Sequence, residues 1–313
     1  MTPFAMPLLP RARWVSLVLV SALAACGAVP SPSTVPYGAP TSGEPAGAPA
    51  KEVVWAVTAD HQLIHFNAGQ PQRVLQRRPV TGLAAGDALV GIDFRVARGV
   101  LYALSRAGRL YTLDTASGAL KPVGDAPAAL PLSGTAFGVD FNPVADRVRV
   151  VSDSGQNLRL HPDTGAVVDF DPNTPGLQPD PALAYAPGDA HAGKPPQVVG
   201  AAYTYNKRDD KLTSNYAIDR ALGVLVTQGS VEGASPVVSP NTGRLSTVGP
   251  LGLGPLFDAS FDIADINNQA YAALRTPGDA RTRLYRIDLG SGRAQLMGTV
   301  GDGAPLRGMA IEP

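Results

Sequence analysis

Short apolar runs alternate with turn-forming residues along the chain from about residue 51 to its end. The runs are rich in Val, Ile, Tyr and Phe, and their apolar residues do not recur with the 3.6-residue period of a helix. Gly, Pro, Asn and Asp, which favour tight turns, separate one run from the next. The pattern therefore predicts an all-β fold made of many short strands.

The predicted strands fall into sets that resemble one another. Most sets hold four strands, and they recur at intervals of roughly 45 to 60 residues. The predicted strands are Val53–Thr58, Gln62–Phe66, Arg73–Gln76, Val90–Arg95, Val100–Ser105, Arg109–Leu113, Ala119–Val123, Gly138–Phe141, Arg147–Ser152, Asn157–Leu160, Ala166–Phe170, Val199–Tyr205, Leu212–Ile218, Leu222–Gln228, Leu245–Val248, Ser260–Ala264, Ala270–Leu274, Arg283–Ile287 and Ala294–Gly298. Such regular self-similarity favours a β-propeller with four-stranded blades over a β-sandwich of two sheets.

The first strand of three sets carries a central aspartate. Asp93 lies in GIDF, Asp140 in GVDF and Asp262 in SFDI. Ala202 and Ala310 occupy the equivalent position in the other two sets. In a propeller the first strand of each blade lines the central channel, so we expect these three carboxylates near the axis.

The two ends of the domain complement each other. The N-terminal set lacks its first strand, and Arg307–Ile311 near the C-terminus fits that position. Pairing of this strand with the N-terminal blade would close the ring and remove an exposed sheet edge. We therefore expect five blades, with six as the alternative if Ser235–Leu253 forms a blade of its own.

The third strand of each set is expected to end at an Asn or Asp that starts a hairpin turn. Such side chains bond their own downstream backbone, and a following glycine supplies a positive φ. The residues are Asn67, Asp114, Asp163, Asp219 and Asp288.

The run FNPVADRVRVVSDSGQNLRLHPDTG, from Phe141 to Gly165, resembles the bacterial domain-of-unknown-function family 4394. The GIDF and LYAL runs of the second set, AAYTYN at 201–206 and the segment around Asp262 continue the resemblance, which covers about Val53 to Pro313. It implies a β-propeller-like fold in secreted or anchored bacterial proteins. It implies no established activity.

The N-terminus has the pattern of a secretory signal. Arg11 and Arg13 precede an apolar stretch, Trp14–Ala25, that is short for a membrane span. The stretch ends in Leu-Ala-Ala-Cys, which resembles a bacterial lipobox and implies cleavage before Cys26 and lipidation of its thiol. The alternative is a plain signal peptide with an incidental cysteine.

The chain thus divides into three expected parts. Residues 1–25 form a lipoprotein signal peptide, and residues 26–50, rich in Pro, Ala, Gly and Ser, form a disordered tether. Residues 51–313 form a single propeller domain with a long surface loop at 171–197. The expected location is the bacterial cell envelope, outside the cytoplasm, with the domain attached to a membrane through Cys26.

Composition excludes several classes of function. The formal net charge is +0, and no basic stripe appears, so nucleic-acid binding is not expected. A single cysteine excludes an intramolecular disulfide and a thiolate metal cluster. Scattered histidines and the absence of nucleophile or phosphate-loop motifs leave no catalytic signature, and no cofactor is indicated.

Asp93, Asp140 and Asp262 have two interpretations. Converging channel carboxylates can hold a cation or a polar ligand. The interpretation we favour is structural, with each Asp accepting backbone N–H groups of its own or the next blade, because a repeated residue usually serves the repeat. A weaker metal motif, Asp169-x-Asp171-x-Asn173, has the alternating oxygen ligands of a calcium loop but lacks that loop's glycine. The sequence leaves a bound metal open.

A polar cluster in the third set is the preferred ligand site, because no other set carries one. Its members are Asn142, Arg147, Arg149, Asn157 and Arg159. Three guanidinium groups on adjacent strands suit a carboxylate, a phosphate or a sugar. The alternative is a structural network in which Asp146, Asp153 and Asp163 pair with the arginines.

These observations predict a lipid-anchored, extracytoplasmic propeller that acts as a binding or interaction module. Its ligand is a small molecule, a glycan or a protein that the sequence does not identify. The alternative function is a propeller hydrolase or lyase that acts on an extracellular carbohydrate or lactone. An enzyme should have a deep pocket at the channel mouth that contains the three aspartates or their neighbours.

Overall fold

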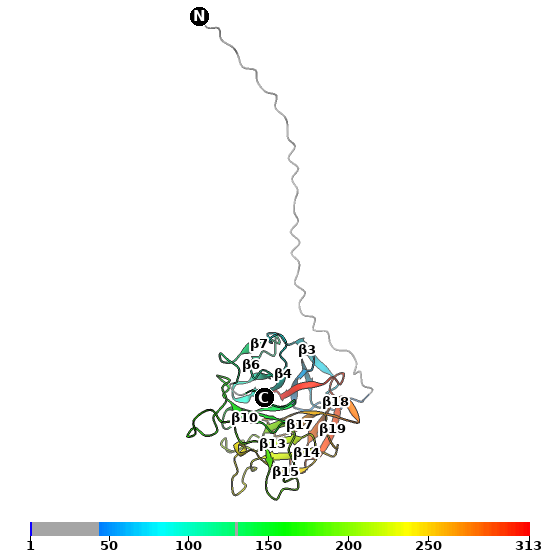
Figure 1. Ribbon diagram of the computed structural model, residues 1–313. Coiled ribbons are helices and arrows are strands. Elements are labelled where there is room, and N and C mark those ends of the chain that lie inside the picture. The colour runs from blue at the N-terminus through cyan, green and yellow to red at the C-terminus, as the bar shows by residue number, and fades with distance from the viewer. Residues whose placement is uncertain (2–43, 129–130) are drawn as a thin grey trace. The chain divides into compact units, whose positions relative to one another are not determined.

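The computed structural model describes Met1, residues 44–128 and residues 131–313. Residues 2–25 of the predicted signal peptide, the predicted lipidation site Cys26 and the tether up to residue 43 lie outside the described residues. Within the described residues, no helix is long and apolar enough to cross a membrane. Residues 44–128 and 131–313 fold into small antiparallel sheets arranged around a common centre (Figure 1).

Five sheets form the blades of a propeller. Blade 1 contains β20 (Leu306–Ile311), β1 (Val53–Thr58), β2 (Gln62–Asn67) and β3 (Val74–Pro79). Blade 2 contains β4 (Leu89–Arg95), β5 (Val100–Ser105), β6 (Leu110–Leu113) and β7 (Leu120–Pro122). Blade 3 contains β8 (Phe137–Asn142), β9 (Arg147–Ser152) and β10 (Asn157–Leu160). Blade 4 contains β12 (Val198–Tyr203), β13 (Asn215–Asp219), β14 (Val224–Gln228), β15 (Arg244–Pro250) and β11 (Ala184–Tyr185). Blade 5 contains β16 (Asp258–Ile263), β17 (Ala270–Thr276), β18 (Asp279–Ile287) and β19 (Ala294–Thr299).

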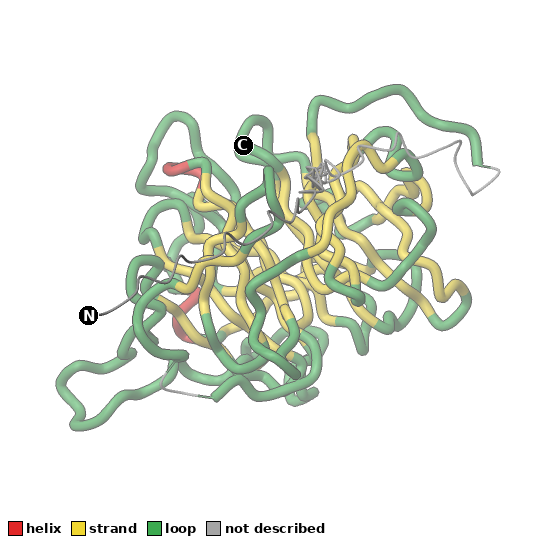
Figure 2. The backbone as a smooth tube through the Cα atoms, turned by 90° about the horizontal axis from the view of Figure 1, so that it is seen from above, coloured by secondary structure: helices red, strands yellow, loops and turns green. Residues whose placement is uncertain are grey.

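Helical structure in the described residues is limited to two single turns of 3₁₀-helix, Val96–Arg98 and Pro240–Thr242. The strands fill the middle of the domain, and the connecting loops lie on two opposite sides of it (Figure 2). This arrangement confirms the all-β propeller that the apolar pattern predicts.

The ring closes as predicted, through pairing of the last strand with the first. β20 runs antiparallel to β1, with Val54 opposite Ile311. Next to this pair, Trp55 Nε1 donates a hydrogen bond to Glu312 Oε2 at 3.1 Å, and the Trp55 ring stacks on His65. The six-blade alternative is wrong, because β15, which lies within the segment considered for a sixth blade, is hydrogen-bonded into blade 4.

Blades 3 and 4 depart from the predicted repeat. The expected fourth strand of blade 3 is reduced to a single bridge between Leu160 and Val167. The long loop at 171–197 instead contributes β11, which pairs in parallel with β15 at the outer edge of blade 4. Its prediction as a surface loop alone is therefore too simple, because part of it completes a sheet.

The hairpin expected after Asp219 is also misplaced. Asp219 ends β13, which is the second strand of blade 4 and not the third. Its carboxylate still caps a turn, with Oδ1 accepting from Ala221 N at 2.9 Å. The other predicted turn residues do follow third strands, as Asp288 does after β18.

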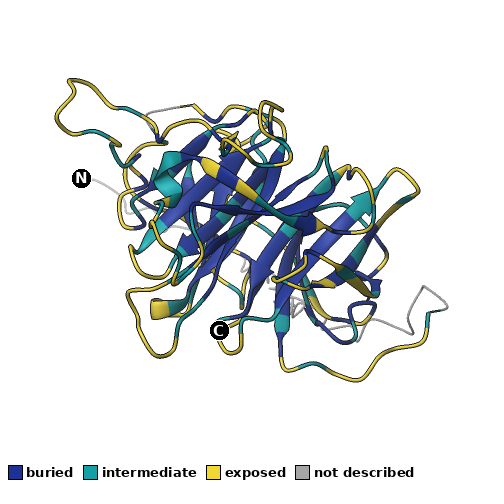
Figure 3. Cartoon of the chain, turned by 90° about the horizontal axis from the view of Figure 1, so that it is seen from below, coloured by how far each residue is buried: buried dark blue, intermediate teal, exposed yellow. Residues whose placement is uncertain are grey.

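The core lies between adjacent blades and at the centre of the ring, where the strands are almost continuously buried (Figure 3). The inner strands β4, β8, β12, β16 and β20 touch their neighbours directly around the axis. Glycines permit this approach. A Cβ on Gly138 would lie 2.6 Å from the backbone nitrogen of Ala201, and one on Gly308 would lie 2.7 Å from that of Ile92.

Residues 44–50 contain no regular secondary structure but contact two blades. The Glu44 carboxylate lies 2.8 Å from Arg283 Nη2 and accepts from Thr299 N at 3.1 Å. Ala50 N donates to Asn67 Oδ1 at 2.8 Å. This stretch therefore spans from blade 5 to blade 1 before the first strand begins.

Candidate functional site

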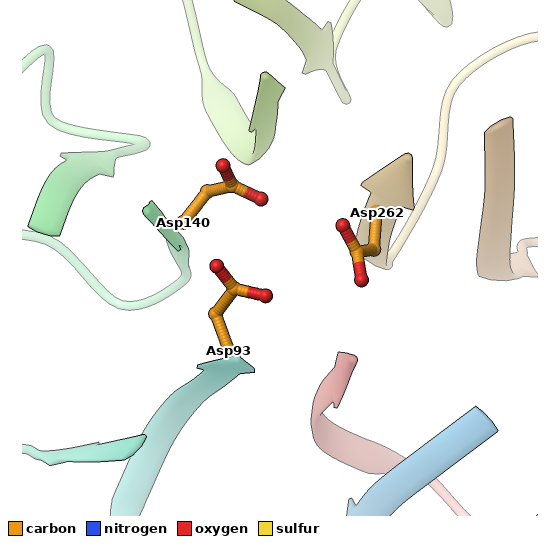
Figure 4. A group of neighbouring side chains, drawn as sticks. All are labelled: Asp93, Asp140 and Asp262. Carbon is orange, nitrogen blue, oxygen red and sulfur yellow. The ribbon is translucent and has the colours of Figure 1, made fainter. Parts of the chain in front are cut away.

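The three aspartates of the repeated motif meet at the axis of the ring. Asp93 on β4, Asp140 on β8 and Asp262 on β16 point toward one another (Figure 4). One carboxylate oxygen from each lies within 4.8 Å of the others, and the residues are 3–6% exposed. Each of these aspartates lies two residues after the glycine or serine at which the inner strands approach one another around the axis. The side-chain period of a strand therefore places both positions on the inner face.

Each aspartate also bonds the backbone of the next blade. Asp93 Oδ2 accepts from Phe141 N at 2.6 Å, and Asp140 Oδ1 accepts from Tyr203 N at 3.1 Å. Asp262 Oδ2 accepts from Ile311 N at 2.6 Å. In every case the N–H donor belongs to the following blade. It is the residue just after the position that corresponds to the aspartate. The two sequence interpretations thus describe one arrangement, in which the carboxylates converge and also join blades.

Burial changes the protonation of these carboxyl groups. Loss of solvent raises the pKa of Asp262 to about 7, and it raises the pKa values of Asp93 and Asp140 well above the ordinary range. The charge of Asp262 adds to the shift at Asp93, and the charges of Asp93 and Asp262 add to it at Asp140. A hydrogen bond between the carboxyl groups of Asp140 and Asp262 requires a shared proton.

The triad has two chemical capacities. It can hold protons near neutral pH, because repulsion disfavours three charges in a small buried space. Its oxygens also lie within the span of ligands around Ca²⁺, whose bonds to oxygen are about 2.3–2.6 Å long. Among the described residues, no Lys or Arg side chain bonds to any of the three carboxylates.

The axis beside the triad has no room for a substrate. The space there measures about 10 Å³, and Gly91, Gly138, Gly200 and Gly308 are among the residues that line it. A cavity that holds one water molecule needs about 10–15 Å³ on the same measure, so this space is at most the size of one water. The deep pocket at the channel mouth that an enzyme of this kind needs is not found around the aspartates in the described part of the chain.

The arginine cluster of blade 3 already holds a carboxylate from the chain itself. Arg149 Nη1 lies 2.6 Å from Asp180 Oδ2, and Arg159 Nη2 lies 2.7 Å from Asp180 Oδ1. Arg149 is 1% exposed and the Asp180 side chain 0%. Asp180 comes from the long loop at 171–197. The structural interpretation of the cluster paired the arginines with the wrong acids. Asp180 is the acid that pairs with Arg149 and Arg159.

The three acids first considered as partners serve other contacts. Asp146 and Asp163 bind Arg95 of blade 2, and Asp153 binds Arg220 of blade 4. These pairs join blade 3 to its neighbours on either side. The polar surface of blade 3 is therefore used to assemble the ring.

The remaining members of the predicted cluster do not form an open anion site. Asn157 is buried, and its Oδ1 accepts from Arg149 and from Gln228. Asn142 Oδ1 caps the turn that follows β8, and Arg147 donates to backbone oxygens beside it. The donors expected to grip a ligand are thus engaged within the fold. Arg149 and Asn157 are buried, and Asn142, Arg147 and Arg159 are half-buried, where the sequence suggested an exposed patch.

The calcium-like motif forms a turn that satisfies itself. Asp169 Oδ1 accepts from Asp171 N and Gln178 N, and Asp171 accepts from Asn173 and Thr174. The acidic group that does converge within the described residues is the axial triad.

A groove of about 580 Å³ lies on blade 5, at the ends of β18 and β19. Its polar side chains are Asn268, Gln269, Arg286, Arg293 and Gln295, together with Asp288. The Asp288 carboxylate is engaged by the turn it caps, with Oδ1 accepting from Ser291 N at 2.8 Å. We call this feature the blade-5 groove.

The guanidinium groups of the blade-5 groove keep free donors. Arg286 Nη2 donates to Gln295 Oε1, and the Arg293 side chain has no hydrogen bond or ion pair within residues 44–128 and 131–313. Both arginines are exposed. The sequence-based search missed this groove because its residues sit at strand ends in the final set. The available signal was the alternation of Arg286, near the end of β18, with Asp288, the residue that follows the strand.

Comparison with protein families finds one match over most of the chain. The family is described as "Domain of unknown function (DUF4394)", and its model matches residues 62–310. Comparison with curated proteins found no match.

Comparison with solved structures finds distant likenesses. A nidogen/laminin complex has 12% identity and a TM-score of 0.42, with 84% of this chain and 98% of that chain covered. Glutaminyl cyclase from Myxococcus xanthus has 10% identity and a TM-score of 0.41, with 79% and 95% covered. YCF48 bound to a D1 peptide has 9% identity and a TM-score of 0.36, with 80% of this chain and 64% of that chain covered. Likenesses this distant carry no information about the ligand of this chain.

Proposed function

The chain belongs to the DUF4394 family, and from this starting point we propose that it is a lipid-anchored, extracytoplasmic binding module. The proposed ligand site is the blade-5 groove. The proposed anchor is Cys26, because the one cysteine of the chain falls where a lipobox-like motif ends. The proposed location is the bacterial cell envelope.

The observation that carries the ligand proposal is the composition of the blade-5 groove. Its volume of about 580 Å³ falls in the range of small-molecule sites, about 300–1,000 Å³. Two guanidinium groups and three primary amides line it. Guanidinium groups bind carboxylates and phosphates with paired hydrogen bonds, and amides both donate to and accept from hydroxyl groups.

This donor set suits an acidic glycan, which presents carboxylates and hydroxyl groups together. The free Arg293 guanidinium supplies the contact to the acid, and Gln269 and Gln295 supply contacts to hydroxyls. Both amide atoms of Asn268 are bonded to the backbone of Tyr205. The groove is shallow and polar, which fits a segment of a chain better than a small apolar molecule. Glycans of this kind are also available outside the cytoplasm, where the N-terminal signal would direct the protein.

A hydrolase or lyase is the second candidate, and the perturbed carboxyl groups of the axial triad favour it. Against it stands the space of about 10 Å³ on the axis, which admits no sugar ring. The same three side chains are also engaged by the backbone of the following blades. We therefore propose binding over catalysis.

The test measures binding of polygalacturonate to the full chain in detergent, with uncharged dextran as the matched neutral polymer. Titration calorimetry should detect the acidic polymer and not dextran. R293A should weaken binding about tenfold or more, since a hydrogen bond to a charged group contributes about 1.5–3 kcal/mol. R286A should weaken it in the same direction.

R98A provides the control, because Arg98 is an exposed arginine on the loop of blade 2, away from the groove. It should bind like the wild type. Equal binding by R293A, R286A and the wild type would place the ligand elsewhere. Equal binding of dextran would refute the acidic class, and turnover of either polymer would favour the enzyme.

A further inference from the structure

The amide of Asn215 is buried without any hydrogen bond. Asn215 opens β13 and is 2% exposed, and neither its Nδ2 nor its Oδ1 has a partner among the described residues. Buried polar groups in folded proteins are nearly always bonded to protein or to ordered water. An amide left bare in an interior destabilises the fold, because it has lost its hydrogen bonds to water without gaining others.

A second buried amide oxygen lies beside it. Asn215 pairs in register with Gln228 on β14, and directly opposed residues of antiparallel strands project from the same face with Cβ atoms about 4.5–5.5 Å apart. Gln228 is 0% exposed, and its Oε1 also has no partner among the described residues. Three unpartnered polar atoms thus sit on two adjacent side chains.

The two amides do not bond each other, and the nitrogen of the Gln228 amide is fixed by other bonds. Gln228 Nε2 donates to Pro240 O at 2.7 Å and to Asn157 Oδ1 at 3.0 Å. These two bonds orient the Gln228 amide plane and use only its nitrogen, so Oε1 stays available as an acceptor.

The surroundings are polar as well as buried. Tyr203 pairs with Asn215 on its other side, and its hydroxyl accepts from Arg149 Nε at 3.2 Å. Arg149 in turn contacts Asp180 and Asn157 of the blade 3 side. We call this group, which comprises Arg149, Asn157, Asp180, Tyr203, Asn215 and Gln228, the polar seam between blades 3 and 4.

We propose that the polar seam is a binding site for an internal water molecule, which bridges Asn215 and Gln228. One water supplies both kinds of contact that are needed. Its two hydrogens reach Asn215 Oδ1 and Gln228 Oε1, and its oxygen accepts from Asn215 Nδ2. Internal waters with about three such bonds are a regular part of globular proteins.

The water completes the seam, because without it these three adjacent atoms lack hydrogen-bond partners. The nearby apolar cluster of Val151, Ala217, Val226 and Leu245 excludes bulk solvent. The bridging water is therefore held in place and does not exchange freely. It is an integral part of the contact between the two blades.

A crystal structure of the full chain at about 1.5 Å resolution or better tests the site directly. The expected result is one ordered peak within about 2.6–3.2 Å of Asn215 Oδ1, Asn215 Nδ2 and Gln228 Oε1. Empty density would overturn the proposal. Elongated density, too large for one water, would replace it with a small organic solute.

The sign of a stability change gives an independent test. Leucine has the same number of side-chain atoms as asparagine, so N215L removes the amide with little change of shape. If a water bridges the amides, N215L displaces it, leaves Gln228 Oε1 bare and lowers Tm by several degrees. If the amide is bare, its removal takes away an unpartnered polar group and raises Tm instead, and the proposal fails. Y203F, which removes a hydroxyl already bonded to Arg149, gives the scale for one lost contact in the same seam.

Discussion

Asp140 Oδ1 accepts a hydrogen bond from the backbone N–H of Tyr203 at 3.1 Å, across 63 residues of chain. The hydroxyl of the same tyrosine accepts from Arg149, which holds Asp180. Tyr203 thus contacts the axial triad with its backbone and the polar seam with its side chain. Changes at either place are expected to act on the contact between blades 3 and 4.

The triad should make stability depend on pH. Burial and neighbouring charge raise the pKa of Asp140 in the folded state well above its unfolded value of about 3.9. A raised pKa of an acid means that the fold prefers the proton. This stability is fully present below about pH 4 and is lost as pH rises through the folded pKa. Asp262, with a pKa of about 7, places part of this loss near neutral pH.

D140N isolates that effect. An amide oxygen can still accept from Tyr203 N, and the amide nitrogen can donate to Asp262, as the protonated acid does. We expect the Tm of D140N minus that of wild type to increase from pH 5 to pH 8. At pH 8 the Tm of D140N should be higher than the Tm of wild type. Thermal unfolding by circular dichroism at constant ionic strength measures this.

D262N is the matched contrast. Both Asp262 oxygens accept backbone N–H groups, from Ile263 and from Ile311, so an amide nitrogen must face a donor in either orientation. We expect D262N to lower Tm at every pH. A pH-independent difference for D140N would contradict the proton account. Loss of wild-type stability on adding a chelator at pH 8 would indicate that a divalent cation neutralises the triad.

R149A should destabilise the domain severely. Its removal leaves Asp180, a carboxylate with 0% exposure, without one of its two cations. Loss of one partner of a buried ion pair costs about 3–5 kcal/mol. R147A, which loses only bonds to nearby backbone oxygens, should stay within about 0.5 kcal/mol. Denaturant unfolding compares the two, and similar values would show that the buried pair is not essential.

G138A should disturb the closed axis. A Cβ at this position lies 2.6 Å from Ala201 N and 2.7 Å from Gly200 C, both of them backbone atoms of β12. Overpacking of this kind costs about 1–3 kcal/mol. G278A is the control, because a Cβ there meets nothing within 4 Å. The test compares the Tm values of G138A, G278A and wild type. An unchanged Tm for G138A would mean that the inner strands separate easily.

C26S should release the protein from membranes. A lipid on Cys26 would hold the protein at a bilayer, and serine cannot take a thioether-linked lipid. After fractionation of cells, wild type is expected in the membrane pellet and C26S in the soluble extracytoplasmic fraction. Sedimentation of C26S with membranes would argue against the anchor.

The strands and the axial aspartates follow from the sequence because both obey a local rule. A period-2 apolar pattern sets each strand, and repetition aligns Asp93, Asp140 and Asp262 before their contacts are known. Ring closure also follows, since the first set lacks a strand that the C-terminus supplies.

Partners drawn from loops were not predictable in this way. Asp180 lies 31 residues from Arg149, in a segment rich in Pro and Gly whose path no periodicity describes. Nearer acids were the natural assignment for the arginines, and the structure commits those to other blades. The blade-5 groove was missed for a related reason, because it depends on how turns at strand ends are spaced.

The pairing of β20 with β1 also sets an order in time. β1 precedes every other strand of the ring in the chain, yet its partner is β20, whose Ile311 lies opposite Val54. Until the last strand arrives, blade 1 has a bare inner edge and the ring stays open. Blades 2 to 5 can assemble from contiguous segments, whereas blade 1, which joins the two ends of the domain, is the last to be completed.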